Sequence, residues 1–265
     1  MTAPFNDFTE VDLNELRGAK SKLEHPSLTA KIAALIGKPI EAGFRLLPSS
    51  WNEKVADIAQ ATLFKGLQFA IGTIGEGEIR GSRDWLHRVL VTGSGIAGGA
   101  IGLTSLPVEL PISTTIILRS IADIARSESH DVNLLDVKLA CLEVFALGGQ
   151  AEDSFAGEGY WVVRAALARS VSEAAAFIAQ RGVAEEGAPP LVRLLAAIAS
   201  RFSIVVTEEA AAKAVPIVGA AAGGIINFLF MDHFQEMARG HFIVKRLEKK
   251  YGAEPVERAY NELVI

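Results

Sequence analysis

The sequence predicts an all-α protein, and three observations lead to this prediction. Alanine accounts for 40 of the 265 residues, whereas tyrosine and tryptophan number three each, a composition that favours helix over sheet. Apolar residues recur at helical spacing along much of the chain. No alternating strands joined by Asn-Gly or Asp-Gly turns are evident. We therefore expect a single-domain bundle of several helices.

The composition also excludes several classes of protein. Half of the residues are hydrophobic and 22% are charged, which excludes intrinsic disorder. The net charge of −5 argues against nucleic acid as a partner. The single cysteine, Cys141, excludes a disulfide framework and a thiolate-clustered metal site, and it agrees with a reducing cytoplasm. The mixed, acidic first 20 residues do not have the pattern of a signal peptide.

The chain has one predicted domain after a short lead. Residues 1–26 are polar, and we expect them to form a loosely ordered lead. Residues 27–265 then form the helical domain. No linker divides this domain, and no repeat of 20–50 residues is evident.

The first helices are predicted from apolar spacing and from a capping pattern. Apolar residues at helical spacing predict a helix over residues 28–47, with a kink at Pro39. Ser50 and Glu53 match the capping box S-x-x-E, which predicts that the next helix starts there and continues to about Ile74.

The second half of the chain carries four further helical patterns. Amphipathic spacing predicts helices near residues 133–148, 158–182 and 189–207. Glycine and proline residues separate these three segments. A long helix of mixed polarity follows Met231, and we expect it to end before Gly252.

Two segments, residues 89–108 and 214–231, contain no charged residue and are rich in glycine and alanine. About 20 apolar residues span a bilayer, so the first segment has sufficient length and the second is marginal. Both contain little leucine, however, and neither has a flanking belt of aromatic residues. We expect two helices that pack at the centre of the protein or dock on lipid, rather than fixed transmembrane spans.

Several glycines in these segments are spaced as G-x-x-x-G, which lets helices approach closely. Such a stripe serves tight helix packing, and it can also form a groove for an acyl chain. The candidate groove residues are Gly95, Gly98, Gly99, Gly102, Gly219, Gly223, Gly224 and Asn227.

Gly93, Gly95 and Gly98 also match the dinucleotide fingerprint G-x-G-x-x-G. The surrounding sequence does not support that interpretation, because Pro107 and Pro111 interrupt the helix that should follow. The sequence also lacks the alternation of strands and helices that would indicate a parallel sheet. We therefore favour helix packing at these glycines.

Three blocks of sequence resemble the EcsC family of bacterial proteins. They read GGAIGLTSLPVELPISTTIILRSIADIARSESHDV, LACLEVFALGG and VPIVGAAAGGIINFLFMDHFQEMARGHFIVKRLEKKYG, and the resemblance extends over about residues 28–252. It implies a cytosolic or membrane-associated helical protein of a family named for a gene beside an ABC exporter operon linked to secretion. It implies no established reaction and no catalytic residues. More loosely, the glycine-rich pattern is similar to the lipid-binding senescence domain of spartin-type proteins, an analogy at the level of the fold only.

Two acidic residues interrupt apolar runs. Glu109 lies between Pro107 and Pro111, where its charge favours the N-terminus of a helix that we expect to begin near Pro111 or serves as a functional acid. Glu143 lies in LACLEVF, and we expect it to be partly buried with a raised pKa unless it is paired. An arginine from another helix, such as Arg119, is its expected partner, and a catalytic acid is the alternative role.

Charged residues form two further candidate sites. Arg119, Asp123 and Arg126 follow one another at helical spacing, as an ion-paired face or as a site for a headgroup or a partner protein. Lys245 and Arg246 belong to a basic run that continues to Lys249 and Lys250 at the end of the last long helix. These cations suit a helix C-terminus, and they also suit anionic phospholipid.

Histidines lie within the polar and aromatic segment that precedes this basic run. One predicted core stripe consists of Phe230, Phe234, Met237, His241 and Val244. His233, Glu236 and His241 could supply metal ligands, but no H-E-x-x-H motif accompanies them. We expect no metal and no other cofactor.

These observations predict a non-catalytic protein that binds lipid or associates with a membrane, as an accessory to secretion, ABC export or envelope maintenance. We expect it in the cytoplasm, peripheral to the inner membrane, with a phospholipid or another apolar ligand as partner. One alternative is a metal-assisted hydrolase that uses Glu143 or Glu109 with His233 and His241. Another is an interaction module that docks on an exporter.

Overall fold

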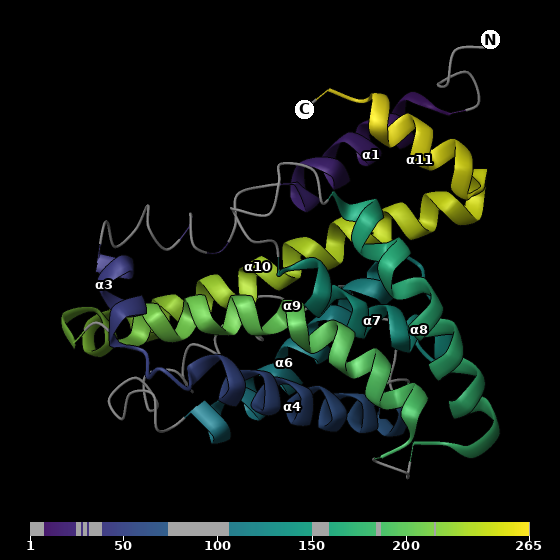
Figure 1. The fold of residues 1–265 in the computed structure, drawn as a ribbon. Helices are drawn as coiled ribbons and strands as arrows, with labels where there is room; N and C mark the ends of the chain where they lie inside the picture. The colour runs from purple at the N-terminus through teal and green to yellow at the C-terminus, as the bar shows by residue number, and fades with distance from the viewer. Residues whose placement is uncertain are drawn as a thin grey trace.

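The computed structural model describes residues 8–24, 28, 31, 39–73, 106–149, 159–183, 187–214 and 216–264. Within these ranges every regular element is a helix and there is no strand, which confirms the predicted all-α class (Figure 1). The helices are α1 (Glu10–Leu23), α3 (Pro39–Leu46), α4 (Trp51–Thr73), α6 (Leu106–Ser127), α7 (Leu135–Leu147), α8 (Tyr160–Arg181), α9 (Pro189–Ala214), α10 (Pro216–Tyr251) and α11 (Ala253–Glu262).

The central helix of the bundle is α9. It packs against α3, α4, α7, α8 and α10. The Phe202 ring of α9 lies 5.0 Å from Phe145 of α7 and 5.8 Å from Phe234 of α10, centroid to centroid, so one aromatic cluster joins three helices. Of the described helices, α9 is the one whose length and composition would allow it to cross a bilayer. A helix buried among so many others needs the same apolar composition for the core.

The predicted helices in the second half of the chain are confirmed as α7, α8 and α9. The glycine-rich segment 214–231 and the mixed segment after it form one continuous helix, α10, of 36 residues. Ile226 and Phe230 of this segment are buried, whereas Ile225 and Phe228 are exposed. The part of this segment whose side chains are described, residues 224–231, thus has one face in the core and one face at the surface. The segment 89–108 lies outside the described residues except for its last three positions.

Two N-terminal boundaries differ from the prediction. Pro111 lies inside α6, which begins at Leu106. The first amides of a helix have no hydrogen-bond partner within it. A proline in the second turn therefore removes only one backbone hydrogen bond, close to the start of the helix. In the predicted lead, Glu10–Leu23 forms α1, capped by the Thr9 hydroxyl. The buried residues Leu16, Ala19 and Leu23 form too narrow a stripe to stand out in a polar sequence. The domain boundary at residue 27 remains a prediction.

Glycines allow close helix contacts, but at other positions than those predicted. A Cβ atom on Gly43 of α3 would lie 1.9 Å from the carbonyl oxygen of Ala211 in α9, and one on Gly149 would lie 2.1 Å from that of Arg201. Among the predicted groove glycines, Gly95, Gly98, Gly99 and Gly102 lie outside the described residues. Gly219 and Gly223 belong to α10, where only their helical backbone is described, and Gly224 is half-buried.

Candidate functional site

A buried polar cluster joins the start of α6 to the end of α9 and the first half of α10. The Lys213 ammonium donates to Glu109 Oε1 and to Glu209 Oε1, each at 2.7 Å. The Asn227 amide donates to Glu109 Oε1 at 3.1 Å. All four side chains are buried. Burial of charge is costly unless the charges are paired, and here one cation serves two carboxylates.

The charges of this cluster support one another. Burial raises the pKa of Glu209, although the Lys213 ammonium acts in the opposite direction. Burial also disfavours the charged form of Lys213, but the Glu209 and Glu109 carboxylates outweigh it and raise the pKa of Lys213. Lys213 is therefore held protonated, which excludes it as an amine nucleophile at neutral pH. The arrangement fixes three helix segments relative to one another.

Two members of this cluster, Glu109 and Asn227, are predicted separately from the sequence. Glu109 lies in the first turn of α6, as expected for a charge that favours a helix N-terminus. Asn227 was a predicted groove residue, and the structure brings it into contact with Glu109. Glu209 and Lys213 were missed, although their spacing of four residues in the alanine-rich stretch TEEAAAKA is typical of an ion pair on a helix.

Around this cluster, large apolar side chains are exposed. Six of the ten large hydrophobic residues found exposed in the described chain lie on α3, α6 and α10. The bond between Glu109 and Asn227 joins α6 to α10, and Gly43 places α3 on α9 two residues before Lys213. We call this group of residues the apolar end; it consists of Phe44, Leu46, Val108, Ile112, Ile225 and Phe228.

A second buried network surrounds His241. Its Nδ1 atom lies 3.0 Å from the Tyr160 hydroxyl, and its Nε2 atom lies 3.7 Å from Glu143 Oε2. Burial raises the pKa of Glu143 and lowers that of His241 well below its ordinary value. The expected burial of Glu143 is therefore confirmed. The prediction that Arg119 is its partner is wrong, because Glu143 on α7 faces His241 of α10 instead.

The candidate metal ligands do not converge. His233 Nε2 donates to the Gly148 carbonyl oxygen at 2.9 Å, and Glu236 pairs with Lys31. No group of three His, Cys, Asp or Glu side chains within the described ranges is placed to hold a metal ion. Of the four residues of the hydrolase alternative, Glu143 and His241 face each other, whereas Glu109 contacts Lys213 and His233 contacts Gly148.

The charged line on α6 forms an ion pair within the helix. Arg126 Nη1 lies 2.9 Å from Asp123 Oδ1, and both side chains are largely buried. The two residues are thus ion-paired, but within one helix and away from water rather than on a solvated or interhelical face. Arg119 is half-buried three turns after Glu109 on the same helix.

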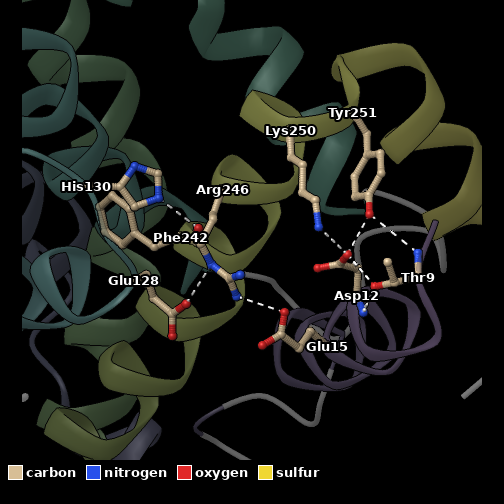
Figure 2. A network of polar contacts seen from close by, with 9 residues as sticks. All are labelled: Thr9, Asp12, Glu15, Glu128, His130, Phe242, Arg246, Lys250 and Tyr251. Carbon is tan, nitrogen blue, oxygen red and sulfur yellow. Dashed lines mark hydrogen bonds and ion pairs between the residues drawn. The ribbon is translucent and has the colours of Figure 1, made fainter. Parts of the chain in front are cut away.

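The basic run of α10 contacts the N-terminal helix (Figure 2). Arg246 pairs with Glu15 of α1 at 3.0 Å and with Glu128 at 3.2 Å. Lys250 pairs with Asp12 at 2.7 Å. Lys250 lies 22 residues after Phe228, about 33 Å along the helix axis. The groove residues predicted on α10 and the basic run at the end of the same helix therefore do not form one site.

One further depression lies between α4 and α9, with a volume of about 220 Å³. Asp57, Phe64 and Val192 are among the residues that line it. Pockets for small-molecule ligands usually have about 300–1,000 Å³. The depression is too small for a phospholipid, and none of the predicted site residues contributes to it.

A comparison with known protein families gives one match. The profile of the EcsC protein family matches residues 77–247, which is more than half of the chain. The match includes α6 to α9 and most of α10, and therefore the whole buried cluster of Glu109, Glu209, Lys213 and Asn227. No curated protein and no solved structure matches the chain. On this evidence the chain belongs to the EcsC protein family.

Proposed function

We propose that this protein binds the surface of a phospholipid bilayer through the apolar end and catalyses no reaction. The observation that carries the proposal is that six of the ten exposed large apolar side chains of the described residues lie on α3 and on the parts of α6 and α10 beside the buried cluster. Soluble proteins rarely gather such side chains on one surface unless it contacts a partner or a membrane. Val108 and Ile112 are one helical turn apart on α6, and so are Ile225 and Phe228 on α10.

The course of the chain supports lipid as the partner. Described parts of both uncharged segments belong to the apolar end. Val108 is the last residue of segment 89–108, and Ile225 and Phe228 belong to segment 214–231, most of which forms the first half of α10. A surface without charges loses little hydration free energy when it leaves water. Burial of a large apolar side chain contributes about 1.5–3 kcal/mol, so a few half-exposed side chains suffice for reversible binding.

The buried cluster has a supporting role in this proposal. Lys213 and its two carboxylates tie α6 to α9, and Asn227 adds α10. Because these contacts lie beneath the apolar end, they hold its helices in a fixed arrangement. We propose that the protein lies at the cytoplasmic face of the inner membrane as a peripheral protein. Its role there would be accessory to export or envelope maintenance.

Binding to phosphatidylcholine vesicles, measured by flotation, tests this function. Ile112→Glu and Ile225→Glu place a charge within the apolar end, and we expect each to weaken binding roughly tenfold or more. Val162→Glu on α8 and Leu134→Glu before α7 are matched controls, because the two parent residues are 48% and 46% exposed, close to 51% for Ile112 and 47% for Ile225. Equal loss in all four variants would contradict the proposal, as would unchanged binding of the first two.

A further inference from the structure

The N-terminal helix α1 is a peripheral element of the fold. It packs along the C-terminal half of α10, with a smaller contact to α11, on the upper right in Figure 1. It also lies before residue 77, where the match to the EcsC family begins. The contacts among α4, α6, α7, α8, α9 and α10 do not depend on it. The helix α1 could therefore leave α10 while the contacts among these six helices persist, although Leu16, Ala19 and Leu23 would lose their burial.

Acidic residues of α1 occupy the cations of α10 (Figure 2). Asp12 accepts hydrogen bonds from Lys250, from the Tyr251 hydroxyl and from Thr9. Hydrogen bonds from these groups lower the pKa of Asp12 far below its ordinary value, so it is ionised at neutral pH. Glu15 contacts Arg246 on the same side of the helix. Two carboxylates thus neutralise two members of the basic run.

The covered surface of α10 is apolar as well as basic. Near the other end of α1, the side chain of Leu23 and the carbonyl oxygen of Ala19 lie against Gly240. Ile243 and Leu247 are spaced at helical intervals between Gly240 and Lys250. A helix face with apolar residues beside several cations is typical of segments that lie in the interface of an anionic membrane.

We propose that this face of α10 is a second lipid-binding surface, fitted to anionic phospholipid headgroups, and that α1 is its intrachain competitor. We call it the basic face; its cations are Arg246 and Lys250, the two that contact carboxylates of α1. The inference rests on the proposed membrane function and adds the class of lipid and its control. Lys250 is 54% exposed and Glu15 is 38% exposed. Their partners Asp12 and Arg246 are 8% and 30% exposed, so water and salt reach each pair from one side. Anionic headgroups compete for the cations from that side.

A reversible disulfide between α1 and α10 tests the competition in the full chain. A Cβ atom on Gly240 would lie 2.6 Å from Leu23 Cγ, which is bonded to Leu23 Cβ. The two Cβ atoms would therefore lie within about 4 Å of each other, as a disulfide requires. The variant Leu23→Cys/Gly240→Cys holds α1 in place when oxidised and frees it when reduced. The native Cys141 is buried and does not interfere.

The probe is flotation with vesicles of phosphatidylcholine containing about one-third phosphatidylglycerol, compared with pure phosphatidylcholine. We expect the reduced protein to bind the anionic vesicles roughly tenfold or more tightly than the oxidised protein, with no difference on pure phosphatidylcholine. Equal binding of the two forms to anionic vesicles would overturn the inference. Failure of the proposed function would be a separate result, namely no binding to pure phosphatidylcholine in either form.

A single substitution gives an independent test without a cysteine pair. Asp12→Asn weakens the contact of α1 with Lys250, and Glu10→Gln removes the same charge from an exposed position of α1. We expect the Asp12 variant to bind anionic vesicles more tightly than the Glu10 control. If the two variants bind equally, α1 does not compete with lipid. A stable dimer of either variant, seen by light scattering, would also overturn the inference, because it would assign the basic face to α1 of a second copy.

Discussion

Glu109 and Lys213 are 104 positions apart in the sequence, yet their charged groups form a buried contact of 2.7 Å. The contact joins the first turn of α6 to the last turn of α9. Because Lys213 also holds Glu209, its removal would take from two neighbouring carboxylates the cation that they share. This shared cation determines how substitutions in the cluster should change the free energy of unfolding.

Lys213→Met should lower the free energy of unfolding by about 3–5 kcal/mol, the usual cost of an uncompensated buried charge. Glu109→Gln should cost less, because Lys213 keeps Glu209 as a partner. Urea denaturation of both variants measures the difference. A loss below about 1 kcal/mol in Lys213→Met would show that the cluster is not buried as described.

Gly43→Ala should destabilise the protein, although alanine is the better helix former. Its Cβ atom would meet the backbone carbonyl of Ala211 at 1.9 Å, so α3 would have to move away from α9. Gly18→Ala in α1 is the matched control, since no atom lies within 4 Å of the added Cβ. We expect this control to be neutral or to stabilise by up to about 1 kcal/mol. Thermal unfolding of the two variants measures these opposite effects, and a gain in both would contradict the close contact.

Stability should depend on pH through His233. Burial lowers the pKa of His233 to about 4, despite the hydrogen bond to Gly148. In the unfolded chain its pKa is about 6.5. Between these values the unfolded state binds a proton that the folded state does not, so the contribution of His233 to stability is complete above pH 6.5 and is lost as the pH falls toward 4.

His233→Gln retains an N–H group for the Gly148 carbonyl and removes the titration. Between pH 7 and pH 4 the titration of His233 should lower the free energy of unfolding of the parent protein by up to roughly 3 kcal/mol. The variant should not show this loss. The variant must be compared with the parent protein at each pH, because buried Glu143 and Glu209 have raised pKa values and act in the opposite direction. Parallel pH profiles for the two proteins, measured by urea denaturation, would show that His233 is not buried in its neutral form.

Cys141 should not react with thiol reagents in the folded protein. Its side chain is fully buried, and burial raises the pKa of the thiol to about 12. We expect labelling by an aromatic disulfide reagent to require denaturant and to follow the unfolding transition. Rapid labelling under native conditions would indicate that α7 separates from the bundle.

The helices of the core could be predicted from the sequence, because long periodic segments leave little choice of secondary structure. The stripe from Phe230 to Val244 is buried as predicted, since apolar spacing of three and four residues fixes one face of a long helix. Helix α1 was missed because three buried apolar residues in a largely polar segment give a weak pattern. Its burial depends on Gly240, which is distant in the sequence.

The candidate site could be predicted in part only. Local sequence marked Glu109 and Asn227 as unusual, but periodicity cannot show that they meet across 118 positions. The same limit applies to the basic run of α10, whose partners Asp12 and Glu15 lie more than 200 positions away. The sequence shows which residues carry charge, and only the packing of helices shows which charges are neutralised within the chain.

The most direct test of the central claim is to place an environment-sensitive fluorophore at the apolar end. The label is attached to Ile225→Cys, with Val162→Cys as the control, because the parent residues are almost equally exposed and the native Cys141 is buried. We predict that phosphatidylcholine vesicles shift the emission at position 225 to the blue and leave position 162 unchanged. No shift at position 225, or an equal shift at both positions, would contradict the proposal that the apolar end enters lipid.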